Sequence, residues 1–165
     1  MIKVFFKKIV ANIIPLSVFT AVFGIIIFQL FAFFEPYLYP LHWLQADAKV
    51  VNSNVIIGAY PRENDLYTLK NKLHVTTVIS LLNTSGIPQE KDLYDVEKEN
   101  CKASHLKVMN FPLDSDKLNT VGAQEEINKI IGYVQTHKEE KIYIHCYLGK
   151  HRAIKVGQAI EATLK

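Results

Sequence analysis

The segment from Lys141 to Arg152 constrains the fold of this chain more than any other feature. It begins with a short apolar run, which His145 and Cys146 follow directly, and Gly149 comes three residues after the cysteine. An apolar run bounded by turn residues predicts a strand. The cysteine therefore lies where a strand ends and a helix begins. The backbone N–H groups of the loop between them can form an anion-binding nest.

The side chains of this loop suit the chemistry of a bound phosphate group. A cysteine thiolate at the floor of the nest is a nucleophile, and the surrounding N–H groups and helix end favour its ionised form. The guanidinium of Arg152 has a planar fork for two phosphate oxygens, which a lysine ammonium binds less well. The residues expected to line the bound phosphate are Tyr147, Leu148, Gly149, Lys150 and His151. The alternative interpretation, a buried cysteine at a strand end, leaves the glycine and the arginine unexplained.

The pattern His-Cys-x-x-Gly-x-x-Arg at residues 145–152 resembles the signature loop of the cysteine-dependent protein tyrosine and dual-specificity phosphatases. The similarity extends over residues 54–160. Residues 55–61 resemble the first strand of the family and residues 75–82 its next buried strand, while residues 111–116 fall where the family carries its general-acid loop. A motif gains weight from such a structural setting.

This resemblance implies a fold class and a reaction. The fold would be α/β, with a mostly parallel central sheet flanked by helices, as in the dual-specificity phosphatases. The activity would be hydrolysis of phosphomonoesters through a phosphocysteine on Cys146, with Arg152 binding the phosphate and with no metal ion or other cofactor. His145 would orient the loop and support the thiolate. A histidine at a strand end can equally be an ordinary buried residue.

The leaving oxygen of a phosphomonoester needs a proton, so a carboxylic acid should stand opposite the cysteine. Asp114 and Asp116 lie 32 and 30 residues before Cys146, and both spacings are similar to those in the resembling family. We favour Asp114 and leave Asp116 open. The alternative role for either is a solvated loop acid or a helix cap, the commoner role of an exposed aspartate.

The loop leaves the class of substrate open. Lys150 and His151 make it more basic than a minimal loop, which resembles the lipid and inositol phosphate phosphatases of the superfamily. Tyr147 weakens that parallel, because those loops often have a lysine directly after the cysteine. Phosphorylated protein and a phospholipid or phosphoinositide are therefore both candidate substrates.

Ala153 departs from the family pattern, because many relatives have a serine or threonine directly after the arginine. That hydroxyl usually helps to release the phosphate from the enzyme. Either the intermediate is hydrolysed slowly or another polar group takes the role of the hydroxyl, and we predict a detectable phosphocysteine. Together with a chain that ends soon after the next helix, this departure also makes a third function conceivable, a non-catalytic phosphate-binding pseudophosphatase.

A second feature is an uncharged apolar run of 26 residues from Ile9 to Phe34. A helix needs about 20 apolar residues to cross the hydrocarbon core of a bilayer. Aromatic residues gather at the far end of the run, as at a membrane interface: Phe31, Phe33, Phe34, Tyr37, Tyr39 and Trp43. The run therefore predicts one N-terminal transmembrane helix, with the membrane as a partner.

Two alternatives for this run are weaker. The small residues of Ala46-Asp47-Ala48 fit the cleavage site of a signal peptide, but the run is longer than the usual apolar region and the site lies too far beyond it. A buried core helix is disfavoured because the run is apolar on every face.

The charges around the run predict its orientation. Lys3, Lys7 and Lys8 precede it, so the positive-inside rule places the N-terminus in the cytoplasm and the phosphatase domain on the non-cytoplasmic side. An oxidising compartment would expose Cys146 to disulfide formation with Cys101, the only other cysteine. Either the two are too far apart to pair, or the pair is a redox switch, or the orientation is wrong. Sequence spacing does not decide among these.

The predicted organisation is a cytoplasmic tip and transmembrane anchor at 1–35, a linker at 36–53 and a phosphatase domain at 54–165. Within the domain, alternating β-rich and helical segments predict βα units. Strands are expected near residues 54–60, 75–82, 106–111 and 141–145. Helices are expected over residues 62–73, 89–102, 120–136 and 153–164. The charged helix at 89–102 is expected at the surface. A net charge of +3 without a large basic block disfavours nucleic acid as a partner.

Overall fold

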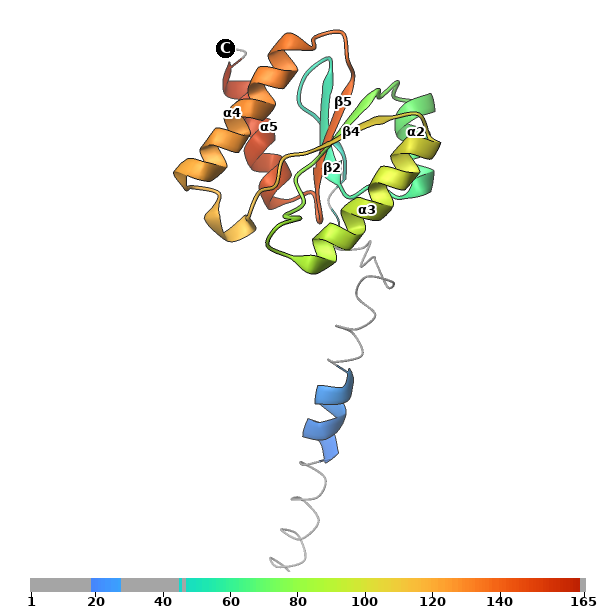
Figure 1. Cartoon of the computed structure of the whole chain (residues 1–165), viewed down its shortest axis with the longest axis vertical. Helices are drawn as coiled ribbons and strands as arrows, with labels where there is room; N and C mark the ends of the chain where they lie inside the picture. Colours follow the sequence, from blue (N-terminus) through green and yellow to red (C-terminus); the bar gives the residue numbers. More distant parts are fainter. Residues whose placement is uncertain (1–18, 28–44, 46, 164–165) are drawn as a thin grey trace, which may run out of the picture. The chain divides into compact units, whose positions relative to one another are not determined.

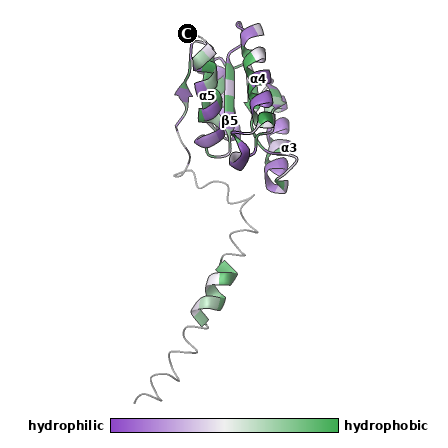
Figure 2. Cartoon of the chain, turned by 90° about the vertical axis from the view of Figure 1, so that its left-hand side faces the viewer, coloured by the Kyte–Doolittle hydropathy of each residue, from purple (hydrophilic) through white to green (hydrophobic). Residues whose placement is uncertain are grey.

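The structure is a computed structural model that describes residues 19–27, 45 and 47–163 (Figure 1). The chain forms two compact units, Met1–Leu41 and His42–Lys165. In the first unit residues 19–27 form a helix whose large apolar side chains are exposed, and Figure 2 colours this helix as hydrophobic. The rings of Phe19 and Phe23 stack on it with centroids 6.0 Å apart.

The transmembrane helix predicted at residues 9–34 is not supported. Of that run the structure describes residues 19–27, and residues 9–18 and 28–34 lie outside the described residues. A helix of this described length rises about 14 Å, roughly half of the hydrocarbon core of a bilayer. No helix among the described residues is long and apolar enough to cross a membrane. The predicted fold is therefore wrong in its N-terminal membrane helix. The predicted single-pass membrane location, with the phosphatase domain on the non-cytoplasmic side, rested on that helix and is corrected with it.

The second unit is built on a five-stranded mixed sheet in the order β1-β2-β5-β3-β4. Its strands are β1 (Lys49–Val50), β2 (Val55–Ala59), β3 (Thr77–Ser80), β4 (Lys107–Asn110) and β5 (Ile142–Cys146). The middle strand β5 pairs in parallel with β2 and β3, and β4 is parallel to β3, while β1 is antiparallel to β2 at one edge. The carboxyl ends of three parallel strands thus meet at the end of β5. Ligands bind at this end of the strands in open α/β sheets.

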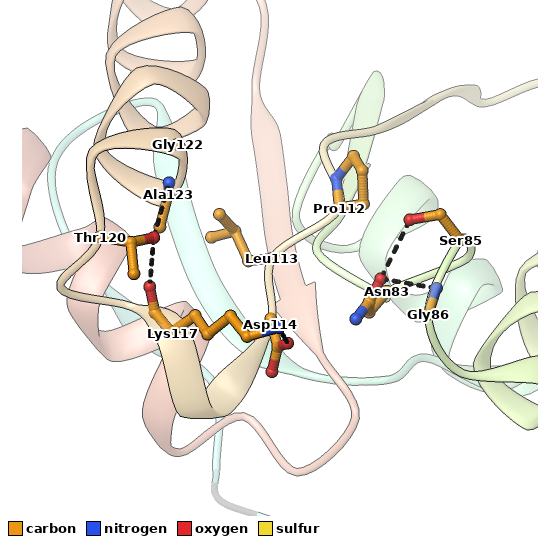
Figure 3. Close-up of a pocket in the computed structure, with 10 residues that line it drawn as sticks. All are labelled: Asn83, Ser85, Gly86, Pro112, Leu113, Asp114, Lys117, Thr120, Gly122 and Ala123. Carbon is orange, nitrogen blue, oxygen red and sulfur yellow. Dashed lines mark hydrogen bonds and ion pairs between the residues drawn. The ribbon is translucent and has the colours of Figure 1, made fainter.

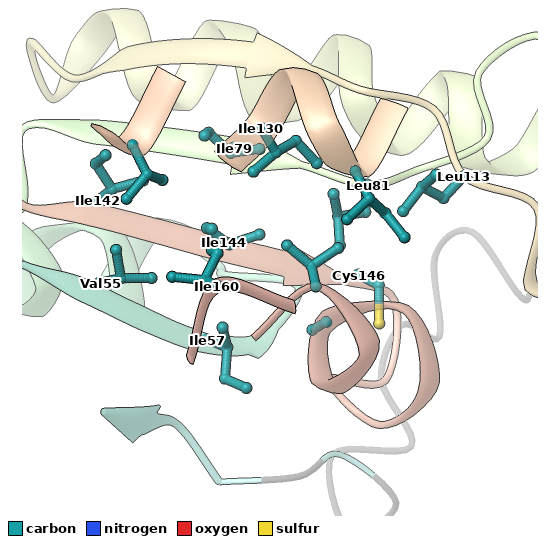
Figure 4. Packing of buried hydrophobic residues seen from close by; sticks show 14 of the residues in the cluster. Val55, Ile57, Ile79, Leu81, Leu113, Ile130, Ile142, Ile144, Cys146 and Ile160 are labelled. Atoms are coloured by element: carbon teal, nitrogen blue, oxygen red, sulfur yellow. The ribbon is translucent and has the colours of Figure 1, made fainter. Parts of the chain in front are cut away.

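Four helices cover the two faces of the sheet: α2 (Glu63–Asn71), α3 (Pro88–Ala103), α4 (Val121–Thr136) and α5 (His151–Thr163). The helices α4 and α5 pack on one face, and α2 and α3 pack on the other. Successive residues of β5 serve the two faces in turn, because side chains alternate along a strand. Ile142, Ile144 and Cys146 join the cluster with α4 and α5, and Tyr143 joins the other. Figure 4 shows Cys146 at the end of the first cluster.

Local signals explain where the helices begin. The Thr120 hydroxyl caps α4 by accepting a hydrogen bond from Ala123 N–H at 3.4 Å. Pro88 stands at the first position of α3, where its missing N–H costs nothing. The helix α5 begins at His151, two residues earlier than predicted, so Arg152 belongs to its first turn.

The four predicted strands and four predicted helices are confirmed to within a few residues at their ends. Two short elements were not predicted, β1 inside the expected linker and the 3-10 helix η2 (Ser115–Lys117). The prediction that the helix at 89–102 lies at the surface is wrong for one of its faces. That face is buried and carries Glu90, Leu93, Glu97 and Cys101. The predicted boundary between linker and domain stays a prediction.

Candidate active site

The chain turns sharply after β5, between the cysteine and α5. Gly149 has a φ of +72°, in the left-handed region that favours glycine. A Cβ at this position would lie 2.6 Å from the backbone nitrogen of Ala59 and 2.7 Å from the carbonyl carbon of Gly58. Only glycine fits here, because both clashing atoms belong to the backbone at the end of β2. The close approach of loop and strand fixes the shape of the turn.

The guanidinium of Arg152 is held by carbonyl and carboxylate oxygens from three other segments. Its Nη1 donates to Leu81 O at 3.0 Å and to Leu113 O at 3.1 Å. Its Nη1 and Nη2 also donate to the two carboxylate oxygens of Glu90, at 2.7 and 2.5 Å. The Glu90 carboxylate in turn accepts from Asn83 N–H at 2.5 Å. The arginine thus reaches the pocket in one defined orientation.

Glu90 stabilises the charge of this arginine. Burial on its own would lower the pKa of Arg152, but the hydrogen bonds and charge of Glu90 raise it above its ordinary value. Cys146 adds a smaller contribution in the same direction. A permanent cation therefore lies beside the cysteine.

A pocket of about 210 Å³ opens over the cysteine and the arginine. It is lined by residues of α3, of η2 and of the loop: Glu90, Ser115, Cys146, Tyr147, Leu148, Lys150, His151 and Arg152. Of the residues predicted to bind phosphate, all except Gly149 are in this lining, and Gly149 is buried against β2. Lys150 and His151 are exposed and contribute cationic or polar groups to the open side.

The two predicted acids do not line this pocket, although Ser115 between them does. Asp114 lines a neighbouring pocket of about 330 Å³ instead, where its carboxylate faces Lys117 (Figure 3). It accepts from Asp116 N–H at 3.1 Å and pairs with Lys117 Nζ at 3.2 Å. These contacts, with a smaller contribution from the charge of Arg152, hold the pKa of Asp114 below its usual range. In this arrangement Asp114 is ionised at neutral pH.

His145 lies on the opposite side of the sheet from Cys146. Its ring is fully buried, and Nε2 is 2.5 Å from Oε1 of Glu97 on α3. In the register of the sheet it stands between Gly58 of β2 and Ser80 of β3. The contacts of His145 are with Glu97 on α3 and with the rings of Tyr60 and Tyr143, and its predicted role in orienting the loop stays a prediction.

Both cysteines are free and buried. Cys146 belongs to the apolar cluster with α4 and α5, and Cys101 belongs to the cluster on the other face. Burial, together with the charge of Glu97, raises the pKa of Cys101 to about 12, so this thiol stays neutral. The two cysteines therefore form no disulfide in this structure. Among the described residues no group of three or more His, Cys, Asp or Glu side chains could hold a metal ion.

Sequence reasoning missed three residues around the site: Glu90, Glu97 and Ser115. A glutamate in the first turn of a helix usually lies at the surface and interacts favourably with the helix dipole, and the sequence around Glu90 alone predicts that role. Both glutamates, however, lie on one helical stripe with Leu93 and Cys101. That shared stripe is the signal in the sequence that points to their burial.

A cysteine at the end of a strand and an arginine in the first turn of the next helix line one pocket, and a tight glycine turn lies between them in the chain. This arrangement is that of a cysteine-dependent phosphatase. The sequence matches the model of the tyrosine phosphatase family over residues 46–160, and the protein belongs to that family. This confirms the resemblance expected from the signature loop and the prediction of a phosphatase. No curated protein sequence gives a significant match.

Solved structures of phosphatases share the fold. The core catalytic domain of the PP-IP phosphatase Siw14 from S. cerevisiae is 19% identical with a TM-score of 0.56, and the match covers 72% of this chain and 66% of that one. PTPMT1 is 18% identical with a TM-score of 0.54, covering 72% and 73%. Tk-PTP in its active form is 20% identical with a TM-score of 0.53, covering 72% and 74%. At these identities the likeness establishes the α/β phosphatase fold.

Proposed function

We propose that the protein hydrolyses phosphomonoesters through a phosphocysteine formed on Cys146. The observation that carries this proposal is the placement of Cys146 and Arg152 in one pocket, with the guanidinium oriented by Glu90. Glu90 occupies the end of the guanidinium, and two backbone carbonyls take up Nη1. These contacts fix the guanidinium beside Cys146, where its planar fork can donate two parallel hydrogen bonds to the oxygens of a phosphate.

The reaction proceeds in two steps. The thiolate of Cys146 attacks phosphorus in line with the ester oxygen, so that an S–P bond forms and the P–O ester bond breaks. The leaving oxygen takes a proton from a carboxylic acid and departs as an alcohol or phenol. A water molecule then attacks phosphorus, the S–P bond breaks, and the carboxylate takes up the proton of the water. The products are inorganic phosphate and the regenerated thiolate.

Asp114 is the acid we favour, and Asp116 is the second candidate. The carboxylate of Asp114 now faces Lys117 in the neighbouring pocket, so the turn that carries it has to move when substrate binds. Ser115 already lines the pocket of Cys146, which supports a movement of η2 that brings one of the two neighbouring carboxylates over the cysteine. Loops of this kind commonly complete a catalytic site only on closure.

Protein phosphotyrosine is the substrate that we favour, because the sequence matches the tyrosine phosphatase family over residues 46–160. A phosphoinositide or another phospholipid phosphate is the second candidate. Exposed Lys150 and His151 in the pocket lining favour the second, because they can bind further phosphate groups. The fold likeness to Siw14, described as a PP-IP phosphatase, points the same way.

A substrate panel tests these proposals. The full chain is assayed with a phosphotyrosyl peptide and with a short-chain phosphatidylinositol phosphate, beside Cys146→Ser. We expect turnover of the peptide that Cys146→Ser abolishes, and Lys150→Ala should lower the turnover of both substrates by similar factors. Selective turnover of the phosphoinositide, with a strong loss in Lys150→Ala, would establish the second candidate. Turnover that survives in Cys146→Ser would overturn the mechanism.

A further inference from the structure

The end of β5 is tied to α3 by a buried pair of polar side chains. Nε2 of His145 lies 2.5 Å from Oε1 of Glu97, and both side chains are 0% exposed. The Tyr143 ring stacks on the imidazole with centroids 5.9 Å apart, and the Tyr60 ring meets it edge-on at 5.7 Å. A histidine and a glutamate are thus enclosed among aromatic rings, one residue before the cysteine.

This arrangement is not explained by stability. Taking a carboxylate out of water carries a large penalty, and replacing a buried ionic pair by apolar residues is often neutral or stabilising. Within the part of the chain that the structure describes, Glu97 Oε2, His145 Nδ1 and Ser80 Oγ are also buried without a hydrogen-bond partner. Each such atom costs about 1–3 kcal/mol. Polar groups that weaken the fold at this point need a role outside stability.

The contacts of α3 lead directly to the loop. Glu97 holds His145, whose neighbour in the chain is Cys146. One turn earlier on the same helix, Leu93 O accepts a hydrogen bond from the Tyr60 hydroxyl at 2.9 Å. Tyr60 N–H in turn donates to Tyr147 O at 3.3 Å, on the other side of the cysteine. The helix therefore fixes the chain immediately before and immediately after Cys146.

The direction of the short contact follows from the groups around it. The contact joins an imidazole nitrogen to a carboxylate oxygen, and we assign Nε2–H of His145 as the donor and the Glu97 oxygen as the acceptor. The other titratable groups facing Glu97 are Tyr60, Tyr94 and Tyr143 and the thiol of Cys101. Burial, with the charge of Glu97 as a further cause, raises the pKa of each of these four groups above its ordinary value. They stay protonated near pH 7, and the hydroxyls of Tyr60 and Tyr143 donate to Leu93 O and to Ala59 O.

We propose that Glu97 is a positioning residue for the phosphatase reaction. It fixes the Nε2–H form and the orientation of His145, and through it the end of β5 and the direction in which the Cys146 thiol enters the pocket. The inference rests on the proposed function of Cys146 as the nucleophile. Glu97 makes no contact with the pocket, so it acts through His145 and leaves phosphate binding by Arg152 unaffected.

The test is Glu97→Leu in the full chain, with Glu99→Leu as the matched control on the exposed face of the same helix. We expect kcat to fall by about 100-fold, the effect of a misplacement near 1 Å, while KM changes by less than about twofold. Alkylation of Cys146 by iodoacetate should slow as well. The conservative variant Glu97→Gln keeps an acceptor oxygen and should recover kcat to within about tenfold of the wild type. A folded Glu97→Leu with the kcat and alkylation rate of the wild type overturns the inference.

Two further measurements keep the outcome decisive if Glu97→Leu does not fold. The double variant Glu97→Leu/His145→Phe removes both polar partners and should regain stability without regaining kcat. In the wild type, ¹⁵N NMR of the His145 ring should find the proton on Nε2, and an unprotonated Nε2 overturns the inference.

Cys146→Ser is assayed in parallel, to separate a failure of the positioning role from a failure of the proposed function. Turnover that persists in Cys146→Ser overturns the proposed function itself, whereas Cys146-dependent turnover that is insensitive to Glu97 overturns only the positioning role.

Discussion

Glu90 of α3 and Arg152 of α5 form a bidentate ion pair, with oxygen–nitrogen distances of 2.5 and 2.7 Å and side chains only 10% and 6% exposed. The two helices lie on opposite faces of the sheet and meet through this pair at the carboxyl end of β5. The pair therefore joins the two layers of the fold at the point where phosphate is expected to bind.

Removing Glu90 should destabilise the fold strongly. Glu90→Ala leaves the guanidinium of Arg152 buried without its anion, which typically lowers the free energy of unfolding by about 3–5 kcal/mol. The control Glu126→Ala breaks the more exposed pair with Lys129 and should change it by less than about 1 kcal/mol. Urea unfolding of the three proteins measures both values. Equal unfolding midpoints for Glu90→Ala and the wild type would show that the buried ion pair does not contribute this free energy to stability.

Gly149→Ala should destroy the shape of the phosphate-binding loop. The positive φ and the contacts with the backbone of Gly58 and Ala59 leave no room for a Cβ. Displacing the loop by about 1 Å should lower kcat/KM by roughly 100-fold. Gly132→Ala, in the middle of α4 with nothing within 4 Å of the added atom, should keep activity and raise stability by up to about 1 kcal/mol. An active Gly149→Ala enzyme contradicts this account of the turn.

Asp114 should determine part of the pH dependence of kcat/KM, which reports the pKa of the acid in the free enzyme. Its pKa is lowered by Asp116 N–H and by Lys117, so the carboxyl loses its proton at a lower pH than an ordinary aspartate. Lys117→Ala removes one of these causes and raises that pKa, which moves the alkaline limb of the kcat/KM profile for phenyl phosphate to higher pH. Asp114→Asn should abolish that limb, and Asp116→Asn should keep it.

The assignment fails if the two asparagine variants behave in the opposite way, in which case Asp116 is the acid. A substrate whose leaving group needs no proton, such as p-nitrophenyl phosphate, serves as the control. Its turnover should depend much less on either aspartate.

Cys101 should make the fold sensitive to alkaline pH. Its pKa rises from 9.0 to about 12 on folding because the thiol is buried. Below pH 9 the thiol keeps its proton in the folded and the unfolded chain, so it adds no pH dependence to the free energy of unfolding. Above pH 9 the unfolded chain loses the proton and the folded chain keeps it, so stability falls with a slope of about 1.4 kcal/mol per pH unit. Urea unfolding at pH 8–10.5 should give a shallower slope for Cys101→Ala, and identical slopes would place the thiol in a more polar environment.

The loop and the strands could be predicted because their signals are local. The apolar run before Cys146 predicts a buried strand from its own residues. The spacings of Gly149 and Arg152 from Cys146 match the signature loop of the phosphatases. The helix α5 begins at His151, earlier than the predicted start at residue 153. The apolar pattern of the helix begins at Ala153, whereas the tight turn at Gly149 allows the helix to begin two residues before it.

The polar groups beneath the loop could not be predicted in the same way. The burial of Glu90 and Glu97 results from the packing of α3 on the sheet, and their partners Arg152 and His145 lie 62 and 48 residues further along the chain. The choice between Asp114 and Asp116 was equally beyond the sequence, because both belong to one short turn whose orientation is set by tertiary contacts. The predicted membrane helix is not supported, because an apolar composition alone does not establish a spanning helix and the described part, residues 19–27, is too short to cross a bilayer.

The most direct test of the account is to trap the phosphoenzyme. Ala153 is fully buried in the apolar cluster and has no hydroxyl to help release the phosphate, so the intermediate should persist. The enzyme is mixed with a phosphotyrosyl peptide, quenched in acid within milliseconds to seconds, and mapped by mass spectrometry. The account predicts one phosphate on the peptide that contains Cys146, and none in Cys146→Ser. Rapid turnover with no phosphate on Cys146 at any time point would contradict it.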